Sequence, residues 1–179
     1  LGHVVQTTEP THIAAAEFAD KVAEQTNGNV TIKIYPQSQL GGDRDMTEQI
    51  QRGALDMGVI SSASISSFSN VVNAMQLPWL VGSYEKLEKI QNSDEVYEIL
   101  NDDLNSINLT VLAIYDYGFR QIITVDPVNS AEDLAGLKLR VPENSMILDM
   151  FDAMGAIPTP MSFGEIYSAL QNGVIDGLE

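Results

Sequence analysis

Apolar residues recur along the chain at two different spacings. Where every second residue is apolar, a half-buried strand is predicted, and the strands so predicted cover residues 3–7, 30–36, 54–61, 109–125 and 137–141. Where apolar residues lie three or four positions apart, helices are predicted, and these begin at or beside Pro10, Asp43, Ser83, Ser93, Ser130, Ser145 and Ser162. The serine-rich segment 61–70 is predicted to be a loop at the C-terminal end of a strand, with a linker as the alternative. The alternation of strands and helices predicts an α/β architecture with mainly parallel strands.

The strand at residues 137–141 ends on a cation. Its leucines and valine point to one face, and Lys138 and Arg140 point to the other. Pro142 then ends the strand. Arg140 is therefore either a solvated charge at an edge or a clamp for an anionic ligand.

One short pattern occurs twice. "IQRGALD" (50–56) and "LQNGVID" (170–176) each close a helix and open a strand, and Gly53 and Gly173 are predicted to take the left-handed conformation that ends a helix. Either this is a common transition met twice by coincidence, or the chain has two similar lobes that face each other across a ligand-binding cleft.

Composition and charge narrow the function classes. The chain has 179 residues, 44% of them hydrophobic, which is enough for one domain or two small ones. The net charge of -16, without any run of lysine or arginine, argues against nucleic acid and anionic membranes as partners. No apolar run reaches the roughly 18 residues that a membrane span needs, so no membrane insertion is expected. If a signal peptide existed, it has been removed.

Few residues suggest covalent or metal chemistry. Cysteine is absent, and His3 and His12 have no partners at metal-ligand spacing. Neither a nucleophile elbow nor a phosphate-binding glycine loop occurs. The 25 carboxylates are too many for an acid–base pair to be chosen by spacing. We therefore expect no catalytic residues, no metal and no cofactor.

Arginine is more informative because the chain has only four. Arg52 lies in the last turn of a predicted helix, where the helix dipole is a sufficient explanation. Arg120 follows Gly118, where the long strand would cross between lobes, and Arg140 ends its strand. Both are candidates for binding a carboxylate through the guanidinium fork. Tyr115, Tyr117 and Phe163 are either pocket walls or, taken singly, core residues.

Four blocks together resemble the solute-binding subunits of tripartite ATP-independent periplasmic (TRAP) transporters: "YPQSQLGGDRDMTEQIQRGALDMGV", "YGFRQI", "LKLRVPEN" and "MGAIPTPMSFGEIYSALQNGVIDGLE". The similarity runs from about Thr8 to Glu179. It implies a type II periplasmic-binding-protein fold, in which two α/β lobes joined by a hinge close on a ligand. We expect the first lobe at residues 1–117, without its return segments, and part of the second at 118–179. A family asparagine would fall just after Glu179, so we expect the chain to be truncated at its C-terminus.

The resemblance also implies site residues. The family arginine that grips the ligand carboxylate matches Arg140, and a second contact matches Arg120. Phe163 matches a phenylalanine that packs on the ligand. The other candidate ligand contacts are Asp43, Arg44, Ser61, Ser62, Tyr117, Glu143 and His12. Glu143 stands where the family often has asparagine. Sialic-acid-binding members carry a carboxylate near Ser61, and its absence argues against that ligand.

The function implied is capture of a small organic acid in the periplasm and its delivery to the TRAP membrane permease. Hydroxyl-bearing Ser61, Ser62 and Ser64 with Asp43 favour a sugar acid such as a uronate or an aldonate. A C4-dicarboxylate or a keto or hydroxy acid is the alternative. Rival hypotheses are an enzyme acting on a carboxylated substrate and a binding protein that signals to a sensor. We expect a monomer.

Overall fold

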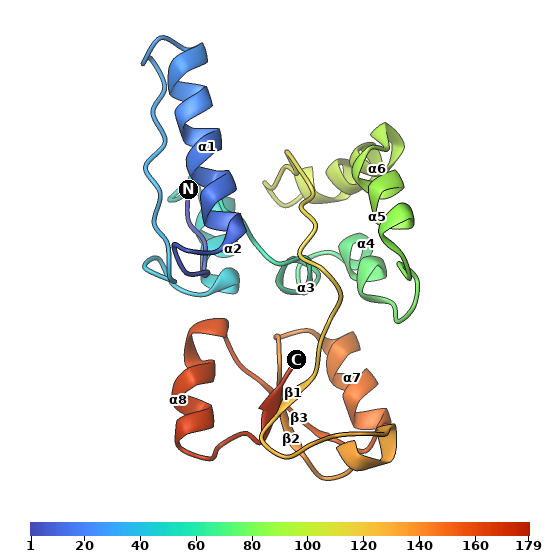
Figure 1. Cartoon of the computed structure of the whole chain (residues 1–179). Coiled ribbons are helices and arrows are strands. Elements are labelled where there is room, and N and C mark those ends of the chain that lie inside the picture. The colour runs from blue at the N-terminus through green and yellow to red at the C-terminus, as the bar shows by residue number, and fades with distance from the viewer. The chain divides into compact units, whose positions relative to one another are not determined.

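The chain folds into two compact units. The computed structural model describes all residues from Leu1 to Glu179, which form the units Leu1–Ser61 and Ser62–Glu179 (Figure 1). Each unit is described by itself. The boundary that we predict between two lobes, at residues 117 and 118, stays a prediction.

The first unit is built around the backbone of Gly2. Gly2 forms parallel bridges to Tyr35 on one side and to Gly58 on the other. The Gly2 amide donates to the Met57 carbonyl at 3.0 Å, and the Val59 amide donates to the Gly2 carbonyl at 2.9 Å. A Cβ at Gly2 would lie 2.6 Å from the sulfur of the fully buried Met46, so this close approach requires glycine. The strand predicted at residues 3–7 is wrong, because the bridge residue is Gly2, which precedes it. The strands predicted at 30–36 and 54–61 are wrong in extent, because each contributes a single bridge residue, Tyr35 or Gly58.

Two helices complete the first unit. Helix α1 (Pro10–Gln25) begins at a proline, whose fixed φ suits the first turn, and buries Ala15 and Ala19. Helix α2 (Asp43–Gln51) begins where the Asp45 carboxylate accepts from the Gly42 amide at 2.9 Å. Both helices confirm the predicted starts.

The second unit opens with short helices. They are α3 (Ser62–Ile65), α4 (Asn70–Asn73), η1 (Ala74–Gln76), α5 (Tyr84–Gln91) and α6 (Asp94–Asn105). The predicted loop at 61–70 is wrong where α3 forms, because Ala63 is buried and the Ser66 hydroxyl bonds its carbonyl at 2.6 Å. Ser83 and Ser93 cap α5 and α6 as predicted, each accepting from a backbone amide at 3.3 Å.

A four-stranded sheet forms the rest of the second unit. Its order is β1 (Ile123–Thr124), β4 (Gly177–Leu178), β2 (Lys138–Val141) and β3 (Ile157–Pro160). Strand β2 is parallel to both of its neighbours, and only β1 runs antiparallel. The 3-10 helices η2 (Ala131–Leu134) and η3 (Phe163–Glu165) and the helices α7 (Ser145–Ala153) and α8 (Ile166–Gln171) complete it.

Helices α7 and α8 flank the sheet (Figure 1). Leu139 and Val141 of β2 are fully buried in one cluster with Ile147 and Phe151 of α7. A second cluster joins Ile166, Ala169 and Ile175 near α8. The apolar face of β2 thus packs on α7, which leaves Arg140 on the opposite face of the strand.

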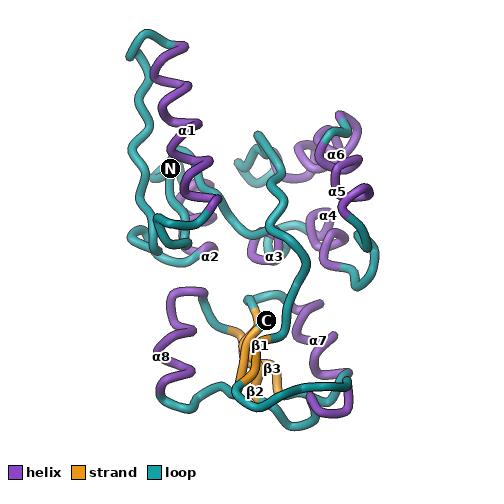
Figure 2. The backbone as a smooth tube through the Cα atoms, in the orientation of Figure 1, coloured by secondary structure: helices purple, strands orange, loops and turns teal.

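The long strand predicted at residues 109–125 is wrong in extent. Only Ile123 and Thr124 pair, with β4, and the rest of the run is drawn as loop (Figure 2). Leu112 is 69% exposed, so its apolar side chain has no layer to cover it. Strong β-propensity therefore does not make a strand where no neighbouring backbone is present to pair.

The repeated pattern has the same backbone structure both times. Gly53 and Gly173 take φ values of 70° and 66°, in the left-handed region as predicted. The Gly53 amide donates to Ile50 at 2.9 Å, and the Gly173 amide donates to Leu170 at 3.1 Å. Both segments therefore end a helix with the same turn.

No helix of the chain combines the length and the apolar character that crossing a membrane requires.

Candidate functional site

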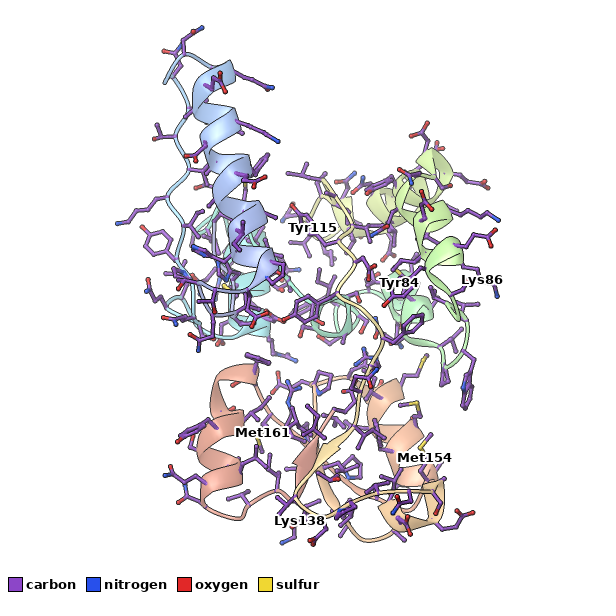
Figure 3. All side chains as sticks on the ribbon, in the orientation of Figure 1. Tyr84, Lys86, Tyr115, Lys138, Met154 and Met161 are labelled. Atoms are coloured by element: carbon purple, nitrogen blue, oxygen red, sulfur yellow. The ribbon has the colours of Figure 1, made fainter.

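Arg140 is buried rather than solvated. Its strand lies inside the sheet, and the residue is only 8% exposed. Its Nε donates to the Met161 carbonyl at 3.1 Å, and Nη1 donates to the Glu179 carbonyl at 3.0 Å. Met161 lies beside α8, on the chain between β3 and η3 (Figure 3). The interpretation of Arg140 as a solvated edge charge is therefore wrong.

Glu179 joins the two predicted ligand-binding arginines. Its amide donates to the Arg140 carbonyl at 3.0 Å, which continues the pairing of β4 with β2. Its side chain is only 3% exposed and forms an ion pair with Arg120. Sequence reasoning missed this carboxylate because it is one of 25 acidic residues without a distinctive spacing.

Arg120 has a second partner in a buried amide. Its Nη2 donates to Oε1 of Gln76, and the Nε2 of Gln76 donates to the Ser62 hydroxyl at 2.9 Å. Gln76 is 9% exposed and ends η1. Polar contacts thus connect Ser62, Gln76, Arg120, Glu179 and Arg140. We call these five residues the arginine network.

The arginine network carries a local excess of positive charge. Two guanidiniums and one carboxylate leave a formal charge of +1 in a chain whose net charge is -16. The Arg120 side chain is 44% exposed, so part of this charge is accessible to solvent. Such an arrangement suits a carboxylate, which a guanidinium binds through charge-assisted hydrogen bonds.

The other candidates in the second unit are exposed. Phe163, at the start of η3, is 47% exposed, and Tyr117 is 68% exposed. Tyr115 is 53% exposed. The alternative that these three aromatic residues belong to the core is therefore wrong. Glu143 is also exposed, although Asn144 beside it is buried.

Two of the four candidates in the first unit are brought together. The Ser61 amide donates to the Asp43 carboxylate at 3.2 Å. Arg44 forms an exposed ion pair with Glu48, one turn further along α2, with its Nε 3.5 Å from the carboxylate. His12 contacts a different residue, the buried His3: the His12 Nδ1 lies 2.9 Å from the His3 Nε2.

The charge state of His3 follows from its surroundings. Burial, and then the neighbouring His12, lower the pKa of the His3 imidazole. His3 is therefore held neutral more strongly than an exposed histidine. No group of three or more histidine, cysteine, aspartate or glutamate residues in the chain is arranged to hold a metal ion.

Comparison with known proteins matches the whole chain to one family. The model for "Bacterial extracellular solute-binding protein, family 7" covers residues 1–179. The C4-dicarboxylate-binding periplasmic protein DctP of Rhodobacter capsulatus is 34% identical over 180 residues, which is 100% of this chain and 54% of DctP.

Two solved structures are similar over nearly the whole chain. A TRAP periplasmic solute binding protein from Anaerococcus prevotii, with bound glucuronate, has a TM-score of 0.95 and 34% identity over 99% of this chain and 58% of its own. A second TRAP periplasmic solute binding protein, from Xanthobacter autotrophicus Py2 with bound galacturonate, has a TM-score of 0.94 and 32% identity. The match covers 99% of this chain and 59% of that protein's chain. The chain thus spans a little over half the length of these proteins. The likenesses confirm the predicted fold class, and the chain belongs to the bacterial extracellular solute-binding proteins of family 7.

Proposed function

We propose that the protein containing this chain captures a small organic acid in the periplasm and delivers it to the permease of a TRAP transporter. The observation that carries the proposal is the arginine network, in which the buried Arg140 and the partly exposed Arg120 are joined through Glu179. An acid approaching a chain of net charge -16 needs such a local cation.

In this proposal Arg140 and Arg120 fix the ligand carboxylate. A hydrogen bond to a charged group contributes about 1.5–3 kcal/mol, which is enough to select acids over neutral analogues. Phe163 would pack on the ligand with its exposed ring. The remaining proposed contacts are Asp43, Arg44, Ser61, Ser62, Tyr117, Glu143 and His12.

A sugar acid is the favoured ligand class. The hydroxyls of Ser61, Ser62 and Ser64 and the Asp43 carboxylate offer partners for sugar hydroxyls. The two similar solved structures named above hold uronates. A C4-dicarboxylate is the second candidate, because the similar DctP protein is named for that class of ligand.

Calorimetry on the full-length protein tests the ligand class. Uronates, aldonates, C4-dicarboxylates and keto acids are titrated separately, with the corresponding neutral sugars as controls. We expect at least one acid to bind and its neutral counterpart to bind at least about tenfold more weakly, which one lost charge-assisted hydrogen bond accounts for. Equal binding of neutral sugars would contradict the proposal.

The proposal also treats the protein as a binding protein rather than an enzyme. The similar DctP protein is a binding protein by name. After prolonged incubation with the full-length protein, the bound acid should be recovered unchanged. Its conversion to a product would support the rival enzymatic hypothesis.

A further inference from the structure

Gln76 is a buried residue whose amide oxygen and amide nitrogen each have a hydrogen-bond partner. Its Oε1 accepts from Arg120, and its Nε2 donates to the Ser62 hydroxyl at 2.9 Å. It is 9% exposed, in a position where an unpaired amide group would be costly. Neither the repeat nor the family motifs single this glutamine out.

The chemistry of arginine fixes which way the Gln76 amide points. A guanidinium has only donors, so the group that faces Arg120 has to be the amide oxygen. The amide nitrogen must then face Ser62. The oxygen and nitrogen of a glutamine are normally hard to distinguish, and here the partner decides between them.

The amide orientation in turn fixes the role of the Ser62 hydroxyl. An amide NH₂ cannot accept a hydrogen bond, so the Ser62 oxygen accepts and its own proton points elsewhere. Ser62 is the first residue of α3, so no preceding helical turn supplies a carbonyl for that proton. The residue is exposed, which leaves its O–H able to donate to a molecule outside the protein.

We infer that Gln76 is a positioning residue, which links Arg120 to Ser62 and presents the Ser62 hydroxyl as a hydrogen-bond donor to an acceptor oxygen of the bound acid. The inference rests on the proposed function and deepens it. Arg120 and Ser62 both act as donors, so the ligand is selected for acceptor oxygens at two places. A ligand with N–H groups there would be rejected.

A double-mutant cycle in the full-length protein tests this coupling, with D-glucuronate as the calorimetric probe. Gln76→Leu should weaken binding about tenfold, and Ser62→Ala about fivefold, as expected for the loss of one or two hydrogen bonds. The double variant should bind like Gln76→Leu alone, because Ser62 acts through Gln76. Additive losses, or binding by Gln76→Leu within about twofold of wild type, would overturn the inference.

Gln76→Glu separates positioning from a purely structural role. A carboxylate accepts from both Arg120 and Ser62, so the fold keeps its contacts, but the Ser62 proton is turned inward. Binding should therefore fall by about tenfold or more while the thermal midpoint of the unliganded protein is kept. Wild-type affinity in this variant would contradict the inference, and this test stands even where Gln76→Leu fails to fold.

A matched control is Gln91→Leu. Gln91 is a partly buried glutamine whose Nε2 donates to the Ile114 carbonyl at 3.2 Å, outside the arginine network. It should leave glucuronate affinity unchanged, and a loss equal to that of Gln76→Leu would overturn the inference. If the wild-type protein binds no acid of the panel, the proposed function fails first. If it binds and the Gln76 variants bind equally well, only the role of Gln76 fails.

Discussion

Arg120 and Glu179 form an ion pair whose two halves differ in exposure. The Glu179 side chain is 3% exposed, whereas that of Arg120 is 44% exposed. The carboxylate is thus fixed inside the second unit, and the guanidinium extends from it toward solvent. This asymmetry holds the cation in place without covering it.

Replacing Glu179 by glutamine should destabilise the fold. The amide oxygen would take the place that faces Arg120, so the NH₂ would replace Oε2, which is buried without a hydrogen-bond partner. We expect a loss of about 2 kcal/mol in the free energy of unfolding, less than for a fully buried pair because Arg120 is exposed to solvent. Urea denaturation of the full-length protein measures it.

The matched control for that variant is Glu85→Gln. Glu85 pairs with Lys89 at 2.8 Å, but both side chains are more than 70% exposed. This control should change stability by no more than about 0.5 kcal/mol. Similar effects of the two substitutions would show that the buried pair has no special role.

Asn144 should be among the residues most important for stability. It is 2% exposed, and its Oδ1 accepts from the Ile147 amide at 2.9 Å to cap α7. Its amide nitrogen lies 3.3 Å from the Ala63 carbonyl and 3.1 Å from Asn73 Oδ1, which ties the start of α7 to α3 and α4. Asn144→Ala should cost about 3 kcal/mol, from a lost cap and unpaired buried partners.

The exposed Asn92 provides the comparison. Its side chain donates to the Glu88 carbonyl at 2.8 Å at the end of α5. Asn92→Ala should cost no more than about 0.5 kcal/mol in the same denaturation assay. An Asn144→Ala variant as stable as Asn92→Ala would contradict the structural role given to Asn144.

The His3 imidazole should make stability depend on pH. Its pKa in the folded protein lies below the ordinary value of 6.5, because of burial and then of His12. As the pH falls below 6.5, the unfolded chain therefore takes up a proton before the folded protein does. The stability that neutral His3 provides is complete above this pH and is lost as the pH falls toward the folded pKa.

Denaturation at about pH 7.5 and about pH 5.5 measures this effect. The wild-type protein should lose more stability between the two than His3→Gln, whose side chain does not titrate. The carboxyl groups of Asp133 and Glu165, which have lowered pKa values because of hydrogen bonds from Asn129 and Ser162 respectively, act at lower pH and should affect both proteins alike. Equal losses in the two proteins would contradict the role of His3.

The features that the sequence predicted well depend on local chemistry. Pro10, the serine caps and the glycines at 53 and 173 act within one helical turn, so their positions in the sequence predict where helices begin and end. The strand predicted at residues 109–125 is too long, because strand formation depends on a partner strand elsewhere in the chain and only Ile123 and Thr124 have one.

The same contrast applies to the candidate site. Alternation predicted which face of β2 carries Arg140, but not that Met161 and Glu179 would cover that face. The side chains of Gln76 and Glu179 contact Arg120, which is 44 residues from Gln76 and 59 residues from Glu179 in sequence. A glutamine and a glutamate without a motif give no sequence signal for such contacts.

The most direct measurement is the affinity of the full-length protein for D-glucuronate and for D-glucose, before and after Arg140→Lys. Lysine keeps the charge but loses the guanidinium fork, which bonds the Met161 and Glu179 carbonyls and which we propose binds the ligand carboxylate. If the arginine network binds the carboxylate, wild type should prefer glucuronate at least about tenfold, and Arg140→Lys should lose most of that preference while glucose binding stays weak. An Arg140→Lys variant that folds and still prefers glucuronate as wild type does would contradict carboxylate capture by this arginine.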